Sequence, residues 1–482
     1  MTIAEFQWAH VVKLIPEIVL VLLIPLVMVL DLRWPESRRR QLGWVSAIGM
    51  FTAVALSFIF SIPTNDMLFG GTIRDDMAAF VFRIIFMFSG AITALLSLDV
   101  EGLGRKGEYY AILIGCVIGM NFMASAADLI MLYLAIETAS IGLYVMAGFL
   151  RDDDKSTESG LKYFLFGAMT STVMLYGFSL LFGYTGETNL YAIGAALRGG
   201  VVDPLPAVII AVLVAVGVGF KVAIVPFHFW TPDVYEGAPT PVTAFLSVAS
   251  KSAGFAVLAR VFLIGLDQGA TGWFSMMAAM AAVTMTVGNF LALPQKNIKR
   301  LLAYSSIAHA GYAMLGIVAL SADGLAATMF YLLAYVFTNL AAFAVVILFA
   351  RATGSDEIAD YAGLSRRSPY LALGMLIAFL SLGGMPPLGG FIGKFFIFAA
   401  AVQSNNVWLA FVGIINSIIG LYYYLVVLKM VYVKPAPEGA KSIDVPRPYA
   451  FALALLCFAI LFTGTVATPW YAWALDAAKS LF

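Results

Sequence analysis

The sequence is poor in the residues that soluble proteins use to face water and to bind metals. Only 12% of its 482 residues are charged, against about 25% in a typical soluble domain. It contains two cysteines and three histidines, and no CxxC pair, which argues against an iron–sulfur or zinc site on this chain. The 28 basic and 28 acidic residues cancel, so the net charge predicts no nucleic-acid partner.

Long apolar runs take the place of the missing charge. Hydrophobic residues make up 62% of the chain. A spanning helix needs roughly 17–25 apolar residues, and about fourteen runs of that kind follow one another with short connections. The sequence therefore predicts an all-α polytopic membrane protein with about 14 transmembrane helices.

Lysine and arginine are unevenly distributed over the predicted loops. Most of them fall in one set of alternate loops, including Arg38, Arg39, Arg366 and Arg367. Basic residues favour the cytoplasmic side of a membrane. This side should therefore be cytoplasmic, and both termini should lie on the opposite side.

A few charged side chains remain inside the predicted spans. Arg83 lies near the outer end of its run, where its long side chain is expected to reach the interface. Lys221, Lys251 and Lys394 lie deep within theirs, and a central charge costs about 2.5–3.5 kcal/mol. Glu137, in "MLYLAIETASIGLY", is the matching acid. Structural ion pairing, or passive lining of a wet crevice, is the alternative to a transport role.

Glutamate and lysine are suited to proton carriage when they are buried together. Burial disfavours the charged form of each side chain, whereas proximity favours it, so the pair is poised to exchange a proton. His228 and His309 add groups that titrate near neutral pH. Ser306 and Tyr312 near His309 favour a relay there, the alternative being a hydrogen-bonded core histidine.

Two of the predicted spans are interrupted by helix breakers. Pro226 follows Lys221, and "SLGGMPPLGGFIGKFF" carries its glycines and prolines ahead of Lys394. Broken backbone at membrane depth is tolerated where it is buried in protein or lines water, and in transporters such breaks mark ion sites. A packing kink is the simpler alternative for either break taken alone.

The polar features recur in the same order along two parts of the chain. Spans four to eight and nine to thirteen begin on opposite sides, which predicts two inverted five-helix repeats with broken helices 7 and 12. The predicted organisation is an N-terminal three-helix segment at 1–108, a first repeat at 109–268, a second repeat at 269–432, and a loop with helix 14 at 433–482.

Four stretches resemble the antiporter-like subunits of proton-pumping NADH:quinone oxidoreductase, respiratory complex I. They are "KVAIVPFHFWTPDVYEGAPTPVTAFLSVASK" at 221–251, "LKYFLFGA" at 161–168, "LLAYSSIAHAGY" at 301–312 and "GGMPPLGGFIGKF" at 383–395. The resemblance covers spans four to thirteen. It is greatest to the subunit-N branch, because "TPDVYEGAPTPVTAFLSVASK" is similar to that branch and Lys394 stands where subunit M has a glutamate.

The resemblance implies roles for individual residues. It implies proton translocation by Glu137, Lys221, Lys251 and Lys394, with Glu137 and Lys221 as a paired switch and Lys394 as the terminal group. It implies modulating or relay roles for Lys162, His228 and His309. It also implies that NADH, FMN, iron–sulfur clusters and quinone bind to other subunits, and that this chain holds no cofactor.

The same resemblance implies the chain's surroundings. The expected partners are membrane-arm subunits, namely antiporter-like subunit M and small subunits of the K and J types, together with lipids. The expected location is a bacterial inner (plasma) membrane, with both termini periplasmic. Two other functions stay open at this point: an Mrp-type cation/proton antiporter subunit, and a membrane-arm scaffold that does not pump.

Overall fold

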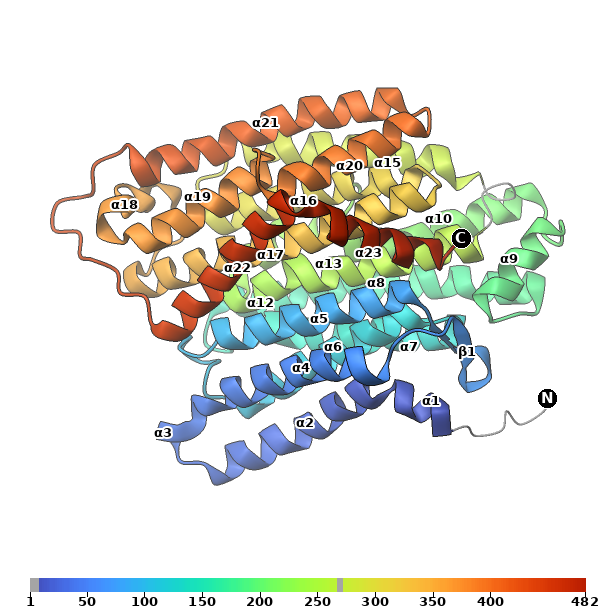
Figure 1. Ribbon diagram of the computed structural model, residues 1–482, viewed down its shortest axis with the longest axis horizontal. Coiled ribbons are helices and arrows are strands. Elements are labelled where there is room, and N and C mark those ends of the chain that lie inside the picture. Colours follow the sequence, from blue (N-terminus) through green and yellow to red (C-terminus); the bar gives the residue numbers. More distant parts are fainter. Residues whose placement is uncertain (1–7, 267–271) are drawn as a thin grey trace.

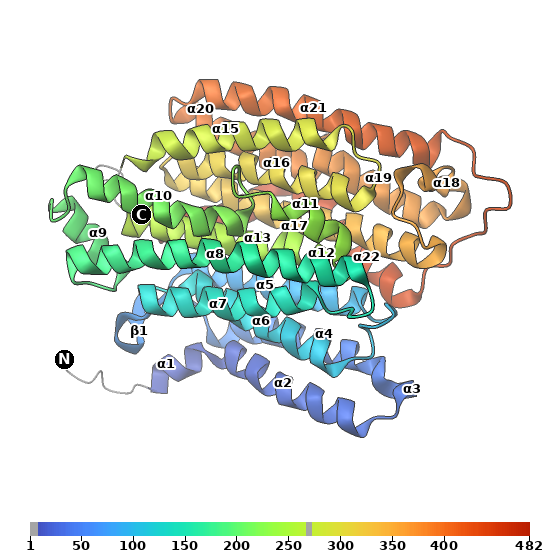
Figure 2. The ribbon, with the colours of Figure 1, turned by 180° about the vertical axis from the view of Figure 1, so that it is seen from behind.

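Long helices run to and fro between the two ends of the bundle (Figures 1 and 2). The computed structural model describes residues 8–266 and 272–482. Within these residues, 13 helices are long and apolar enough to cross a membrane. The predicted twelfth span is divided into two 15-residue helices, α19 (Pro369–Gly383) and α20 (Gly389–Gln403). The prediction of an all-α protein with about 14 spans is confirmed.

The N-terminal part consists of three spans and a small hairpin. Strands β1 and β2 pair antiparallel, with Asp66 opposite Asp75, and lie toward one end of the bundle (Figure 1). In chain order the elements are α1 (Trp8–Lys13), α2 (Ile15–Arg33), α3 (Glu36–Arg39), α4 (Gln41–Phe60), β1 (Asp66–Leu68), the 3₁₀ turn η1 (Phe69–Gly71), β2 (Ile73–Asp75) and α5 (Met77–Leu96).

The middle of the chain begins its helices on side-chain caps. Asp128, Asp153 and Asn189 each accept hydrogen bonds from backbone N–H groups in the first turn that follows. The elements are α6 (Gly107–Ser125), α7 (Leu129–Ala147), α8 (Asp154–Thr185), α9 (Leu190–Arg198), α10 (Pro204–Val222), α11 (Trp230–Gly237), α12 (Thr240–Phe245), the π-helical turn η2 (Leu246–Ser250), α13 (Lys251–Ala259) and a second π-helical turn η3 (Arg260–Gly265).

The C-terminal part surrounds one very long helix, α17 (Ala322–Thr353). The other elements are α15 (Trp273–Ala292), α16 (Ile298–Val318), the 3₁₀ turn η4 (Ile358–Tyr361), α18 (Leu364–Arg367), α19, α20, α21 (Val407–Tyr432), α22 (Arg447–Thr465) and α23 (Ala467–Lys479). The most apolar stretch of α17 is 100% buried, against 28% for α2 at the edge. Apolar edge helices of this kind suit a lipid surrounding.

The predicted spans seven and twelve are broken, as expected: the first is divided into α10 and α11, and the second into α19 and α20. Helix α10 ends at Val222 and is capped by Ala223, whose φ of 60° is left-handed, and α11 begins only at Trp230. Helix α19 ends at Gly383 and is capped by Gly384, with φ of 79°, and α20 begins at Gly389. Both breaks contain a cis X–Pro bond. Lys221 precedes the first break, whereas Lys394 follows the second. The inverted repeat and its boundaries stay predictions, with which this order of elements is compatible.

The expectation that Arg83 reaches the membrane interface is wrong. Its side chain is 2% exposed, and its Nε lies 3.3 Å from Oε1 of the equally buried Glu17. Asn121 of α6 donates to the same Glu17 oxygen at 3.1 Å. Helix α5 packs against both α4 and α6, so packing, rather than depth along the helix, decides where this arginine goes.

A second buried ion pair joins the N-terminal spans to the middle of the chain. Nη2 of Arg260 lies 2.6 Å and 2.8 Å from the two carboxylate oxygens of Asp76, and its Nε donates to the Ala124 carbonyl. Asp76 also caps α5 by accepting from the Ala79 N–H at 2.8 Å. One carboxylate thus fixes the start of α5 and its position beside η3.

We expect Arg260→Met to lower the thermal unfolding midpoint of the detergent-purified protein. The change leaves Asp76 buried without its cation, and breaking a buried pair in this way costs about 3–5 kcal/mol. The double variant Asp76→Asn/Arg260→Met should recover part of the loss. Arg38→Gln, an exposed residue of α3, is the control. Equal midpoints for Arg260→Met and Arg38→Gln would contradict the assignment.

Candidate functional site

Lys394 lies just after the second helix break, near the start of α20. Its side chain is buried, and its Nζ donates to the Leu382 carbonyl and to Oγ of Ser417, both at 2.9 Å. Leu382 belongs to the last turn of α19, where carbonyls have no partner within the helix and the helix dipole favours a cation. A Cβ at Gly384 would lie 3.1 Å from Cδ of Lys394. The glycine therefore serves both the left-handed turn and the room that the lysine needs.

Lys251 follows the π-helical turn η2 and points at α16. It is buried, and its Nζ donates to the carbonyl and to the hydroxyl of Ser306. Ser306 Oγ in turn lies 3.3 Å from the Tyr235 hydroxyl of α11. Within residues 8–266 and 272–482, no carboxylate pairs with Lys251.

Lys221 occupies the last turn of α10, just before the first break. Its Nζ donates to Oγ of Ser140 on α7 and lies 6.0 Å from the centre of the Tyr144 ring. Helix α13 approaches closely here, since a Cβ at Gly254 would lie 3.1 Å from Cβ of Lys221 and 2.7 Å from the Val222 side chain. Lys221 is thereby packed between α7 and the helix that carries Lys251.

Glu137 lies on α7, near Lys221 but not in a direct ion pair with it. Its carboxylate accepts a hydrogen bond from Ser171 of α8. Residues 137 and 140 are neighbours on the helix surface because they are three apart, so the partner of Lys221 adjoins Glu137. The structure therefore brings the predicted pair to one side of α7, with Ser140 between them.

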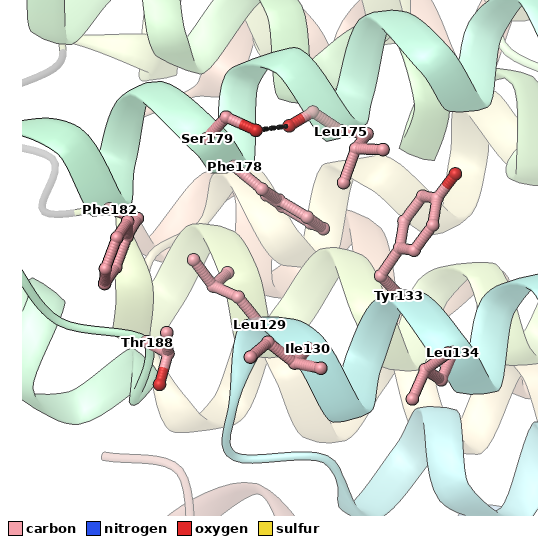
Figure 3. Close-up of a pocket in the computed structure, with 9 residues that line it drawn as sticks. All are labelled: Leu129, Ile130, Tyr133, Leu134, Leu175, Phe178, Ser179, Phe182 and Thr188. Atoms are coloured by element: carbon pink, nitrogen blue, oxygen red, sulfur yellow. Dashed lines mark hydrogen bonds between the residues drawn. The ribbon is translucent and has the colours of Figure 1, made fainter.

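An apolar groove runs along α7 and α8 (Figure 3). It has a volume of about 330 Å³ and opens on the surface of the chain. Figure 3 shows the Tyr133 ring at one end of the groove and Phe182 at the other. It is lined by Leu129, Ile130, Tyr133, Leu134, Leu175, Phe178, Ser179, Phe182 and Thr188. The half-buried Glu137 thus lies one helical turn from Tyr133, at an apolar edge of the chain.

His309 is held by two tyrosines. Its Nδ1 lies 2.5 Å from the Tyr331 hydroxyl and its Nε2 lies 3.2 Å from the Tyr424 hydroxyl. The Tyr424 hydroxyl also bonds to Oγ of Ser305. Ser305 adjoins Ser306, the residue that holds Lys251, so α16 places the Lys251 contact directly beside the histidine's hydrogen-bonded group.

The same group continues toward Lys394. The hydroxyls of Tyr423 and Tyr424 lie 3.5 Å apart, and Tyr423 donates to Oδ1 of Asn289 at 3.1 Å. Nδ2 of Asn289 donates to the Tyr312 hydroxyl at 3.0 Å. Nζ of Lys394 lies 4.9 Å from the centre of the Tyr312 ring. Polar contacts therefore connect the surroundings of Lys251 with those of Lys394.

His228 and Lys162 lie apart from Glu137, the three lysines deep inside the spans and the hydrogen-bonded residues between Lys251 and Lys394, which together we call the lysine line. His228 is in the break after α10, is 5% exposed, and has no described contact with the four predicted transporting residues. Lys162 forms ion pairs with Glu158 at 2.6 Å and Asp233 at 2.7 Å rather than with Glu137. It belongs to a charged cluster that joins α8, α11 and α16 around a hollow of about 220 Å³, formed by Lys155, Glu158, Lys162, Asp233, Glu236 and Arg300.

Several polar residues of the site were not predicted from the sequence. Tyr423 and Tyr424 stand in "LYYYL", where three successive tyrosines within a span were the available signal. Asn289 is the one amide in its apolar run. Ser140 and Ser171 carry no comparable signal, because serine is common in membrane helices and bonds to its own helix backbone.

Metal binding has no candidate site in the described parts of the chain. Within them, no three His, Cys, Asp or Glu side chains are grouped so that they hold an ion. The residues that connect Lys251 with Lys394 instead carry amines, hydroxyls, amides and one imidazole, which are groups that donate and accept hydrogen bonds.

A membrane bundle with two broken helices and a buried line of lysines defines an ion-translocating protein of the antiporter type. A family model described as "NADH:quinone oxidoreductase/Mrp antiporter, TM" matches residues 126–420, more than half of the chain. Subunit N of NADH-quinone oxidoreductase from Moorella thermoacetica is 43% identical over 458 residues, which cover 94% of this chain and 95% of that protein. The chain belongs to the subunit N family of NADH-quinone oxidoreductases.

Solved structures agree with this assignment. A chain of respiratory complex I from Thermus thermophilus, determined with bound aureothin, superposes with a TM-score of 0.80 at 33% identity, covering 94% of this chain and 98% of that one. A chain of the Mrp complex from Dietzia sp. superposes with a TM-score of 0.86 at 19% identity, covering 99% and 98%. At that identity the Mrp likeness is one of fold alone.

We expect Tyr424→Phe to slow proton translocation by at least about fivefold, measured as acidification of vesicles that contain the assembled complex. The hydroxyl joins Ser305, His309 and Tyr423, and losing a hydrogen bond of this kind raises a barrier by about 1 kcal/mol or more. Tyr422→Phe is the matched control, because Tyr422 is 63% exposed on the same helix. Equal rates for the two variants would remove Tyr424 from the path.

Proposed function

We propose that this chain translocates protons as the antiporter-like subunit N of a membrane-bound NADH:quinone oxidoreductase. Protons would pass along Glu137, Lys221, Lys251 and Lys394, with His309 and its tyrosines between the last two lysines. The 43% identical relative is named as this subunit. NADH oxidation and quinone reduction are assigned to other subunits, with NADH, FMN, iron–sulfur clusters and quinone bound there.

One observation carries the proposal: each of the three lysines deep inside the spans is held by a serine, whereas the buried Lys299 at the start of α16 pairs with Asp356. Ser140 holds Lys221, Ser306 holds Lys251 and Ser417 holds Lys394. A carboxylate stabilises the ammonium form alone. A serine hydroxyl accepts from the ammonium form and, once rotated, donates to the neutral amine. Both protonation states of each lysine therefore keep a hydrogen bond, as a proton carrier requires.

The order in which the lysines are connected supports the movement of protons along the membrane plane. Lys221 and Lys251 are linked by the close packing of α10 and α13 at Gly254. Lys251 and Lys394 are linked through Ser306, Ser305 and the tyrosine group of α16 and α21. In the proposal, Lys162 acts from the charged cluster by holding α11 beside α8. His228, inside the break, is the candidate relay toward the cytoplasmic end.

The proposed orientation places both termini in the periplasm and the basic loops in the cytoplasm of a bacterial inner membrane. Helices α1 and α23 lie toward one end of the bundle, and α3 and α18 lie at the other (Figure 1). Helices α3 and α18 carry Arg38, Arg39, Arg366 and Arg367. Positive residues at the end without the termini support this orientation.

The proposed partners are the neighbouring membrane-arm subunits, with small K- and J-type subunits and antiporter-like subunit M among them. A half-buried carboxylate at a lipid-facing edge is costly, and Glu137 lies at such an edge in the isolated chain. A neighbouring subunit seated on the groove of α7 and α8 would cover it. The path would then continue into that subunit.

We expect Lys251→Met and Lys251→Arg both to reduce the number of protons moved per NADH oxidised, measured in proteoliposomes with a pH-sensitive dye. Methionine removes the titrating group, and arginine keeps the charge but does not release its proton at physiological pH. Lys429→Met, an exposed lysine of α21, should pump as the wild type does.

The two variants separate the remaining roles of Lys251. Normal pumping by Lys251→Arg together with loss in Lys251→Met would make Lys251 a structural cation. Normal pumping by both variants in a fully assembled complex would support a scaffold that does not pump.

Purification distinguishes subunit N from an Mrp-type antiporter subunit. We expect the tagged chain, extracted in mild detergent, to co-migrate with NADH-oxidising activity on size exclusion. A tagged peripheral variant such as Lys429→Met should behave identically. Recovery of the chain free of that activity, with sodium- or potassium-driven proton movement in vesicles, would favour the antiporter.

A further inference from the structure

A second apolar groove lies away from the lysine line, on the outer surface of α4, α5 and α22. Both α4 and α22 pack against α5, and the hollow between them has a volume of about 330 Å³. Ile48 of α4 is 59% exposed and Phe451 of α22 is 58% exposed on its two sides. The full lining is Trp44, Ala47, Ile48, Phe51, Leu95, Phe451 and Leu455.

Arginines stand at one end of this groove. Residues four apart share a helix face, so Arg40 lies one turn before Trp44 and Arg447 lies one turn before Phe451. Arg40 is fixed by two hydrogen bonds to Asp99, at 2.7 Å and 3.0 Å, and Arg351 lies 3.4 Å from the same carboxylate. We call Arg40, Arg351 and Arg447 the arginine collar.

The collar has more positive charge than its own carboxylate neutralises. Asp99 faces both Arg40 and Arg351, whose side chains are still 43% and 44% exposed. Arg447 is exposed and forms no ion pair with any described residue. The Asp99 N–H donates to the Tyr449 hydroxyl at 3.1 Å, which ties the turn after α5 to the start of α22. Arg40 and Arg351 thus share one carboxylate, and Arg447 adds an exposed positive charge at the start of α22, whose Tyr449 bonds to the same turn.

The depth of the groove matches one leaflet of a bilayer. From Trp44 to Phe51, α4 rises about 10 Å at 1.5 Å per residue, against a hydrocarbon core of about 30 Å. Trp44 lies at the collar end, where tryptophan favours the membrane interface. The groove therefore begins at the headgroup level of the arginine-rich side and ends within the same leaflet.

We propose that an anionic phospholipid binds here, with an acyl chain along the groove and its phosphate against the arginine collar. Guanidinium groups bind phosphate through paired hydrogen bonds, and basic pockets between helices on the cytoplasmic side bind anionic headgroups. A neighbouring helix would fill the groove but would leave the surplus positive charge without a counter-charge. The inference does not depend on proton translocation.

Photo-crosslinking tests the proposal on the assembled complex. The complex is reconstituted in phosphatidylcholine vesicles with a small fraction of phosphatidylglycerol that carries a photoactivatable group on one acyl chain. Mass spectrometry then locates the labelled peptides. We expect labelling within 41–60 and 447–465, competed by unlabelled phosphatidylglycerol and not by added phosphatidylcholine.

Variants of the arginine collar measure how much the arginines contribute to lipid labelling. Arg40→Gln/Arg447→Gln should reduce labelling about tenfold, as the loss of a charge-assisted hydrogen bond to phosphate typically does. Arg447→Gln alone should reduce it in part and disturbs no described ion pair. Ile48→Trp, which fills the groove and leaves the collar intact, should also reduce it. Arg38→Gln, basic and at the same end, should label as the wild type does.

Three results would overturn the proposal. Equal competition by phosphatidylcholine would show that the groove binds any lipid, whatever the charge of its headgroup. Unchanged labelling in both Arg447→Gln and the double variant would separate the collar from the groove. Crosslinks from α4 and α22 to another subunit, in place of lipid, would show that a protein partner fills the groove. Quinone reductase activity reports assembly of every variant.

Discussion

A lysine ammonium inside an apolar bundle must find hydrogen-bond acceptors in place of water, and most of this architecture serves that requirement. Acceptors of two kinds are present: serine hydroxyls on neighbouring helices, and backbone carbonyls such as those of Leu382 and Ser306. The helix break before Lys394 exposes such carbonyls, and Gly384 and Gly254 bring backbone close enough to enclose the lysines. The helices that carry Lys251 and its surroundings lie at the centre of the bundle, where lipid does not reach.

The buried cations of this chain fall into two groups with different partners. Arg83, Arg260 and Lys299 face the carboxylates of Glu17, Asp76 and Asp356, and the Arg260–Asp76 pair holds the N-terminal spans to the middle of the chain. Lys221, Lys251 and Lys394 donate to hydroxyl and carbonyl oxygen atoms. A carboxylate favours the charged form of its partner, whereas a hydroxyl can hydrogen-bond to the ammonium and to the neutral amine. The choice of partner therefore separates structural cations from those suited to transport.

The residues that could be identified most clearly from the sequence are those whose position in the membrane costs free energy. Lys221, Lys251, Lys394 and Glu137 stand out because a charge in the middle of an apolar run destabilises the spanning helix unless a partner or a function compensates for it. The broken helices stand out through their prolines and glycines. Arg83 was misjudged because distance along a helix does not show which side chains cover it. The position of Lys162 in the charged cluster, and the separation of His228 from the lysine line, depend on contacts between distant segments that no local pattern contains.

The tyrosines and serines escaped prediction for the opposite reason. A hydroxyl costs little in a membrane helix, since it bonds to its own backbone, and nothing distinguishes Ser140 from a serine without a role. Tyr424 gains its importance only when α21 lies against α16 and brings the hydroxyl to both Ser305 and His309. The same approach of helices brings the hydrogen-bonded group of Tyr423, Tyr424 and Asn289 between the surroundings of Lys251 and those of Lys394.

That link has a consequence for selectivity among ions. A sodium or potassium ion crosses a membrane only where a pore admits its water shell or where a cage of oxygen atoms replaces that shell. Tyr423, Tyr424 and Asn289 are buried and bonded to one another, and their line contains no carboxylate among the described residues. A proton passes along hydrogen bonds without needing space of its own. A path built from these side chains discriminates against alkali cations by its packing, without any dedicated filter.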